Sequence, residues 1–138
     1  MLSYAVGPLD EEIAAALGTN DVGADTFVQA RRLRLSDDEP LAILTNYLPA
    51  RVRVSEEDLR SRSLYACLAS QGINLKIAHQ RISARLLSTE EATLLDEEPP
   101  VACLTVDRIV YDDTGQLVEF GRHVYRASQY SIQSSLVV

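Results

Sequence analysis

The sequence contains no tryptophan and only two cysteines, and it has no apolar run near the roughly 18 residues that a membrane-spanning helix requires. Cys67 and Cys103 lie far apart, with no CxxC pair and no neighbouring histidine pair, which argues against a disulfide framework or a zinc site. We expect both thiols to be buried. Residues 1–10 lack the basic region and long apolar core of a secretory signal, so we expect a cytoplasmic protein without membrane contact.

Positive charge is also scarce, because 13 Lys and Arg residues face 20 Asp and Glu residues and leave a net charge of -7. Non-specific DNA affinity requires a basic patch, so this composition argues against direct binding of the chain to duplex phosphates. The length of 138 residues suits one domain with its own core. We therefore take residues 1–138 as a single domain.

The first elements that the sequence predicts are a short strand and a helix. Residues 2–6 are apolar and β-prone and end at a Gly-Pro pair. Residues 9–17 carry apolar side chains at four-residue spacing together with an acidic first turn, which predicts a helix that Gly18 terminates. The polar residues 19–25 predict a connecting loop.

The next segments predict an antiparallel hairpin. Residues 26–35 alternate between two faces, residues 36–40 have turn chemistry, and residues 41–48 have the β-branched and aromatic content of a return strand. The alternation sends Arg32 and Arg34 out of the same face of the first strand.

Helix and strand signals alternate through the middle of the chain. A capping-box pattern opens a helix over 56–70, with a break near 61–63. Residues 73–87 alternate and predict a strand, although their composition would also tolerate a helix. A second capping-box pattern predicts a short helix over 89–95.

The final third of the chain predicts β-structure throughout. Strands over 101–111 and 117–126 flank a turn at 112–115, and residues 131–138 predict a last strand. Consecutive strands are thus joined by hairpins in two places. The fold class that follows is α+β, with a mainly antiparallel twisted sheet and flanking helices.

Arg32 and Arg34 carry the sharpest chemical signal. Two guanidinium groups on one strand face, with their Cα atoms about 7 Å apart, suit a phosphate or a carboxylate. On local pattern alone, a solvated strand face is the commoner use of such residues.

A second candidate face lies on the strand over 117–126. Glu119, Gly121, His123 and Tyr125 share one parity, and such a face can hold a polyol or sugar, with Gly121 leaving room for the ligand. The alternative is the ordinary outer face of an edge hairpin.

The third candidate is a predicted helix start at Ser63 and Tyr65, where backbone N–H groups and a hydroxyl can bind an anion. Ser63 is otherwise a simple N-cap. No residue spacing suggests a nucleophile with its base or an acid/base pair, and we expect no catalysis, cofactor or metal.

Four segments in order carry a family resemblance: RRLRLSDDEPLAILTNYLP, SLYACL, STEEATLL and VDRIVYDDTGQLVEFGRHVYRASQY. Together they resemble the UTRA domain, the effector-binding half of GntR-type transcription regulators of the HutC subfamily. The resemblance implies a cytoplasmic sensing domain with a chorismate-lyase-like fold that forms a homodimer. In that family an N-terminal winged helix-turn-helix binds DNA, and we expect that part to be absent from this chain.

The resemblance also implies roles for individual residues. The Arg-x-Arg motif would bind the phosphate of an effector, and the other matched residues would line the rest of the pocket. The effector would be a small anionic metabolite, such as a phosphorylated sugar, an amino acid or an organic acid. The implied effector-binding residues are Arg32, Arg34, Ser63, Tyr65, Glu119 and Tyr125.

The chain departs from the family pattern at Leu44, where many sugar-sensing members have glutamate. An apolar side chain cannot accept a hydrogen bond from a hydroxyl, so Leu44 argues against a sugar. Two alternatives follow from the same residues. One is a chorismate-lyase-like enzyme in which Arg34 binds a carboxylate and Glu119 is the acid. The other is a dimerisation module with a degenerate pocket.

Overall fold

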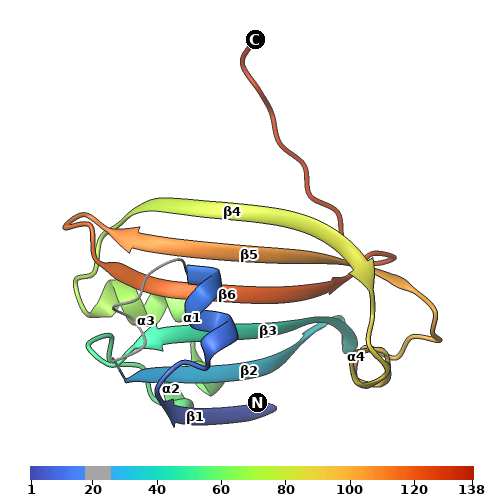
Figure 1. Cartoon of the computed structure of the whole chain (residues 1–138), viewed down its shortest axis with the longest axis horizontal. Coiled ribbons are helices and arrows are strands. Elements are labelled where there is room, and N and C mark those ends of the chain that lie inside the picture. Colours follow the sequence, from blue (N-terminus) through green and yellow to red (C-terminus); the bar gives the residue numbers. More distant parts are fainter. Residues whose placement is uncertain (18–25) are drawn as a thin grey trace.

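The computed structural model describes residues 1–17 and 26–138, and it is built around a six-stranded antiparallel sheet. The strand order across the sheet is β1-β2-β3-β6-β5-β4 (Figure 1). The expected helix stop at Gly18 and loop at 19–25 lie outside the described residues. The strands are β1 (Ser3–Gly7), β2 (Phe27–Ser36), β3 (Glu39–Pro49), β4 (Leu75–Leu86), β5 (Ala102–Asp112) and β6 (Leu117–Arg126).

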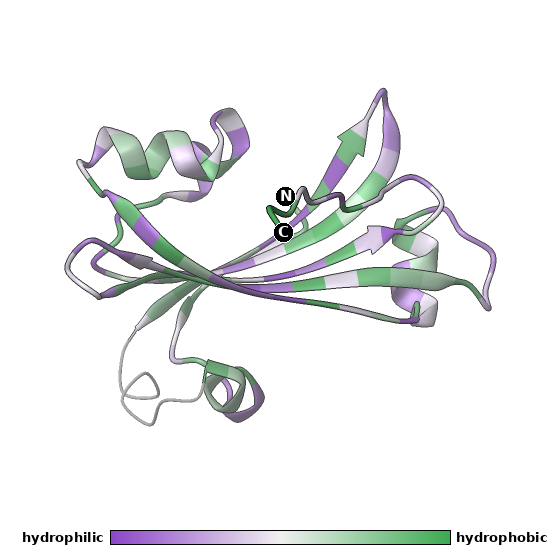
Figure 2. Ribbon diagram, turned by 90° about the horizontal axis from the view of Figure 1, so that it is seen from above, coloured by the Kyte–Doolittle hydropathy of each residue, from purple (hydrophilic) through white to green (hydrophobic). Residues whose placement is uncertain are grey.

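Helices cover both faces of the sheet. In Figure 2, α2 and α3 lie over one face and α1 lies over the other. The α+β class expected from the sequence is therefore confirmed. Within the described residues, no helix has the length and apolar content to cross a membrane. The helices are α1 (Glu11–Leu17), α2 (Glu56–Ser61), α3 (Leu64–Ser70) and α4 (Thr89–Leu94).

The break expected near 61–63 separates α2 from α3. Arg62 and Ser63 both take extended backbone conformations, and the Ser63 hydroxyl then caps α3 by accepting a hydrogen bond from the Ala66 N–H. Both capping boxes predicted from the sequence are present, at Ser55 before α2 and at Ser88 before α4. Each cap satisfies N–H groups that a helix start leaves without partners.

The turn between β2 and β3 is tighter than the five residues expected. Asp37 and Asp38 alone form it, with φ angles of 51° and 66°, and Ser36 pairs directly with Glu39. Two consecutive residues at positive φ match the twist of a two-residue hairpin, and aspartate tolerates that conformation.

The core forms on both sides of the sheet. One buried cluster joins α2 and α3 to the sheet, and it includes the buried thiol of Cys67. A second cluster joins α1 to the opposite face, and Cys103 lies in a third cluster beside α4. Both cysteines are free and buried, as expected.

The prediction of a last strand over 131–138 is wrong for the chain as it stands. These residues form no strand and extend away from the sheet (Figure 1). A strand requires a neighbour that supplies hydrogen bonds, and none of the described strands pairs with this segment. The hairpin of β5 and β6 is likewise not an edge hairpin, because β6 lies between β3 and β5.

Candidate functional site

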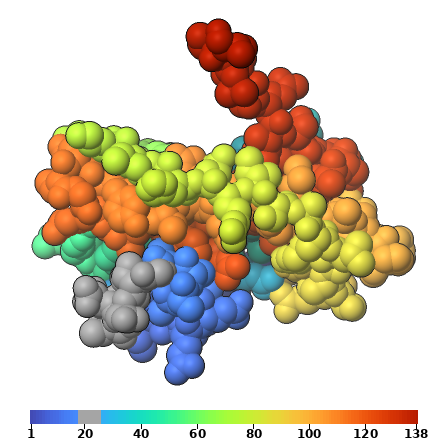
Figure 3. All heavy atoms as spheres, turned by 45° about the horizontal axis from the view of Figure 1, so that its top comes forward, coloured from blue at the N-terminus to red at the C-terminus, as the bar shows by residue number. Residues whose placement is uncertain are grey.

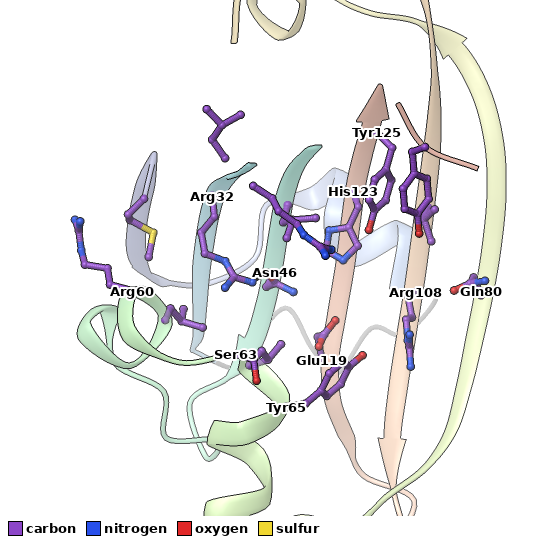
Figure 4. A pocket seen from close by; sticks show the side chains of 18 of the residues that line it. Arg32, Asn46, Arg60, Ser63, Tyr65, Gln80, Arg108, Glu119, His123 and Tyr125 are labelled. Carbon is purple, nitrogen blue, oxygen red and sulfur yellow. Dashed lines mark hydrogen bonds between the residues drawn. The ribbon is translucent and has the colours of Figure 1, made fainter. Parts of the chain in front are cut away.

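A cavity of about 830 Å³ lies on the sheet face that carries α2 and α3 (Figure 4). Five strands, both helices and the residues that follow β6 contribute to its wall. The volume is typical of a site for a small ligand.

Two rows of cross-strand neighbours form the floor of this cavity. Each row crosses several strands, so side chains distant in sequence meet over the middle of the sheet. The first row consists of Arg32, Leu44, His123 and Val106. The second row consists of Asn46, Gly121, Arg108 and Gln80.

The structure brings together every residue that the sequence proposed for effector binding. Two come from β2, two from the start of α3 and two from β6. These residues, all in the cavity wall, are Arg32, Arg34, Ser63, Tyr65, Glu119 and Tyr125.

Arg32 is held in place within the cavity. Its Nη2 donates a hydrogen bond of 2.9 Å to Oδ1 of Asn46, while its Nε is buried with no partner among the described residues. Burial lowers the pKa of Arg32, and the nearby carboxylate of Glu119 opposes that shift. Arg34, by contrast, is exposed at the cavity rim. The two arginines therefore differ in solvation although they share a strand face.

Glu119 is an acidic residue inside the fold, with a side chain only 2% exposed. Its Oε2 has no hydrogen-bond partner in the described structure. Burial raises the pKa of Glu119, and the positive charges of Arg108 and Arg32 together with hydrogen bonding by Asn46 counteract the rise. A buried carboxylate oxygen without a partner is costly, so it is available to a ligand that donates a hydrogen bond.

Gly121 does not leave room for a ligand, which corrects the expectation from the sequence. A Cβ at this position would lie 2.6 Å from Nε2 of His123 and 2.9 Å from Oε1 of Glu119. The side chains of His123 and Glu119, on the same strand, therefore fill the space beside Gly121. The glycine allows them to bend over the backbone toward each other.

His123 is neutral in this environment. Burial, with added effects from Arg32 and Arg108, lowers its pKa to about 4. Its Nδ1 is buried with no partner in the described residues, and its ring meets the Tyr125 ring edge-on at 6.3 Å between centroids. At physiological pH the imidazole adds no charge to the cavity and retains an acceptor and a donor.

Arg108 and Asn46 are cavity residues that the sequence patterns did not single out. The Arg108 guanidinium lies 5.6 Å from the centre of the Tyr65 ring, and its Nε is buried with no partner among the described residues. The sequence did contain a signal that Arg108 faces inward, because Arg108 shares strand parity with Val106 and Val110, which are both buried. Parity alone did not reveal that this face of β5 continues the face of β2 that carries the arginines.

The Ser63 hydroxyl caps α3 by accepting a hydrogen bond of 3.1 Å from the Ala66 N–H. Its own proton remains available for a hydrogen bond into the cavity. Tyr65, one residue into the helix, is 43% exposed. Burial and Glu119 raise the pKa of Tyr65, so its phenol stays protonated at physiological pH.

The charge of the cavity is opposite to that of the chain. The chain carries a net charge of -7, yet most of the charged side chains lining the cavity are arginines. Glu119 contributes the acidic side chain. The arginines are Arg32, Arg34, Arg60 and Arg108.

A family model described as the UTRA domain matches residues 1–131. The chain belongs to the UTRA domain family. The family resemblance carried by the four sequence segments is confirmed. The UTRA domain here spans about half the length of the curated relatives that it matches.

Among those relatives is the HTH-type transcriptional repressor NagR of Bacillus subtilis (strain 168), which is 27% identical over 95% of this chain and 54% of its own length. A solved structure from Streptomyces coelicolor, described as that of a transcriptional regulator, is 42% identical, covers 94% of this chain and 86% of its own, and has a TM-score of 0.84. A ligand-binding domain from Bordetella bronchiseptica, described as that of a GntR-family regulator, is 30% identical and has a TM-score of 0.85. The match covers 99% of this chain and 87% of the other. These names support a regulatory domain and not the enzyme alternative.

Proposed function

We propose that this UTRA domain is the sensing part of a cytoplasmic GntR-type transcription regulator of the HutC subfamily. It binds a small anionic metabolite, and the occupied domain changes DNA binding by a homodimer. The helix-turn-helix that contacts DNA would belong to a segment outside this chain. The names of the relatives, which are regulators and repressors, support the regulatory part of the proposal.

The observation that carries the proposal is the excess of arginine in a cavity of an acidic chain. The Nε atoms of Arg32 and Arg108 are both buried without partners among the described residues, so two donors of the cavity wall are unsatisfied. Guanidinium groups bind phosphate or carboxylate oxygens in pairs of hydrogen bonds. An anionic ligand in the cavity would offer acceptors to these guanidinium groups.

The remaining cavity residues suit the rest of such a ligand. Glu119 accepts hydrogen bonds from hydroxyl or ammonium groups through its free Oε2. Tyr125 and Tyr65 supply aromatic walls, and the Ser63 hydroxyl donates from the start of α3. We therefore assign binding of the anionic end to Arg32 and Arg34, joined by Arg108, and binding of the other end to the residues around Glu119.

Leu44 narrows the choice of ligand. It is the cross-strand partner of Arg32 and His123 and it lines the cavity. An apolar group beside the arginines leaves a ligand hydroxyl at that position without an acceptor. The effector that fits best is anionic at one end and apolar next to the anion, as an organic acid with a hydrocarbon chain is, and not a phosphorylated sugar with hydroxyls on most of its carbons.

The control of DNA binding follows from differential affinity. A ligand changes the arrangement of a dimer only if it binds one arrangement more tightly than the other. The cavity wall combines the sheet with α2, α3 and the residues after β6, so closing around a ligand would move these parts relative to the sheet.

A thermal-shift screen of phosphorylated sugars, amino acids and organic acids tests the proposal. A ligand of the folded domain raises the midpoint of thermal unfolding as its concentration exceeds Kd. We expect at least one anionic compound to do so at micromolar concentration. A domain that no compound stabilises would instead support the dimerisation module with a degenerate pocket.

Arginine variants then locate the site. Arg32→Ala and Arg34→Ala should each weaken binding of the identified anion by about 1.5 to 3 kcal/mol, because each removes a charged hydrogen bond. Arg81→Ala, which removes an exposed arginine of β4 outside the cavity, is the matched control. Equal affinity of all three variants in calorimetry would rule out the arginine pair as the anion site.

A further inference from the structure

Arg32 and Arg108 lie on opposite sides of the cavity (Figure 4). Strands β3 and β6 separate β2 from β5, so the backbones that carry these arginines are about 14 Å apart across the sheet. The two head groups also have different neighbours. Nη2 of Arg32 donates a hydrogen bond to Asn46 on β3, whereas the Arg108 guanidinium contacts the ring of Tyr65. The cavity therefore presents guanidinium groups at two separate positions.

The positive charges at these positions are not neutralised by ion pairs. Among the described residues, Arg32, Arg34 and Arg108 form no ion pair. Glu119 is the acidic side chain of the cavity wall, and one carboxylate cannot balance three guanidinium groups. Charged groups inside a protein require counter-charges. The cavity therefore suits a ligand with more than one negative group.

Tyr65 positions Arg108 without occupying its hydrogen-bond donors. The guanidinium carbon lies 5.6 Å from the centre of the Tyr65 ring. A cation–π contact of this kind uses the charge of the guanidinium and none of its N–H groups. The Nε of Arg108 is buried with no partner among the described residues. Arg108 is therefore held against α3 with donors free to bind a carboxylate.

Arg108 and Glu119 form a pair of opposite charges at their side of the cavity. Arg108 is the cross-strand partner of Gly121, which lies two residues from Glu119 on the same face of β6. Burial raises the pKa of Glu119, and the charge of Arg108 is the largest influence that counteracts the rise. Oε2 of Glu119 and Nε of Arg108 nevertheless lack partners among the described residues. An α-amino acid group offers a partner to both, since its carboxylate accepts hydrogen bonds and its ammonium donates them.

We propose that the effector is an α-amino dicarboxylate that binds across the cavity. Its α-carboxylate binds Arg108 and its ammonium group binds Glu119. Its second carboxylate binds Arg32 and Arg34, and Leu44 contacts the methylene groups beside that carboxylate. The inference rests on the proposed sensing function and gives Arg108 an anion position of its own. Apart from the exposed Arg34, three positive and three negative groups then meet in the cavity.

Ligands that lack one group at a time test the amino-acid end. The dicarboxylates to be used are glutamate, α-aminoadipate and α-aminopimelate. Their counterparts without the amino group are glutarate, adipate and pimelate, and those without the α-carboxylate are γ-aminobutyrate, δ-aminovalerate and ε-aminocaproate. In calorimetry with the parent chain at neutral pH, we expect one amino dicarboxylate to bind about tenfold or more tightly than both of its counterparts. Equal affinity for either counterpart, or no binding by all three amino dicarboxylates, overturns the inference.

Variants then assign each preference to a residue. Arg108→Gln should remove the preference over the counterpart without the α-carboxylate, and Glu119→Gln should reduce the preference over the counterpart without the amino group. Arg81→Gln is the control, because Arg81 is an exposed residue of β4, which runs along the surface beside β5 (Figure 3). It should leave both preferences unchanged. If Arg108 only balanced the charge of Glu119, Arg108→Gln would change the affinity for all ligands alike, and that result overturns the assignment.

Failure of this inference can be distinguished from failure of the sensing proposal. A domain that other anions stabilise in the thermal-shift screen, but that binds none of the amino dicarboxylates, retains the sensing function and loses this choice of ligand. A domain that no compound stabilises loses both.

Discussion

The Nη2 of Arg32 donates a 2.9 Å hydrogen bond to Oδ1 of Asn46, so an uncharged acceptor holds this guanidinium in the cavity. Because Asn46 fixes the side chain without neutralising it, the positive charge remains available to a ligand. Glu119 is close enough to influence the pKa of Arg32, yet the two side chains form no hydrogen bond in the described structure. The pairing of Arg32 with Asn46 therefore keeps a positive charge in the cavity of an acidic protein, which supports the proposed anion site.

The first prediction replaces this neutral acceptor with a charged one. Asn46→Asp should form an ion pair with Arg32 and lower the affinity for an anionic ligand by about tenfold or more, about 1.4 kcal/mol, as measured by calorimetry. Gln29→Glu adds the same charge at an exposed position on β2 outside the cavity and should leave the affinity within error. Equal losses in both variants would indicate a general charge effect and not competition at Arg32.

The second prediction concerns the buried carboxylate of Glu119. Its raised pKa means that the folded chain retains the proton to a higher pH than the unfolded chain, so this group lowers stability as pH rises above its ordinary pKa of 4.5. Glu119→Gln should therefore unfold at a higher urea concentration than the parent at pH 7.5, and the difference should vanish near pH 4. A variant less stable than the parent at pH 7.5 would show that the ionised carboxylate stabilises the fold.

The third prediction concerns His123, whose pKa is lowered to about 4 from 6.5. Between these values the unfolded chain binds a proton that the folded chain does not, so the histidine reduces stability as pH falls through this window. Its contribution is about 3 kcal/mol at full effect. His123→Gln should flatten the pH dependence of urea unfolding between pH 6.5 and 4, whereas His79→Gln, at an exposed position of β4, should not. Identical slopes for the two variants would contradict the assignment.

The fourth prediction uses the close approach at Gly121. A methyl group there would meet His123 and Glu119 at 2.6 and 2.9 Å, so both side chains must shift. Gly121→Ala should cost about 1 to 3 kcal/mol in thermal unfolding and should also weaken ligand binding, because it displaces two cavity residues. Gly7→Ala is the control, since nothing lies within 4 Å of its Cβ position. Unchanged stability in Gly121→Ala would mean that the side chains relax freely.

Local sequence signals were sufficient wherever a structure depends on near neighbours. The capping boxes at Ser55 and Ser88, the break before Ser63 and the hairpin bend at Gly115 all follow from side chains and backbone within a few residues. The strand over 73–87 was also predicted, because alternation survives even in a strand that is exposed throughout. The failure at 131–138 has the opposite origin. The residues there have the composition of a strand, but no strand among the described residues pairs with them.

The same distinction between local and long-range information applies to the residues of the cavity. Strand parity and helix capping are local, so they were enough to predict that Arg32 and Arg34 share a face, that Glu119 and Tyr125 share another, and that Ser63 begins a helix. The position of β6 between β3 and β5 is a property of the whole fold. It makes these faces one surface and adds Asn46 and Arg108 to it. Register between strands distant in sequence depends on burial of the whole sheet against its helices. No window of local sequence contains that information.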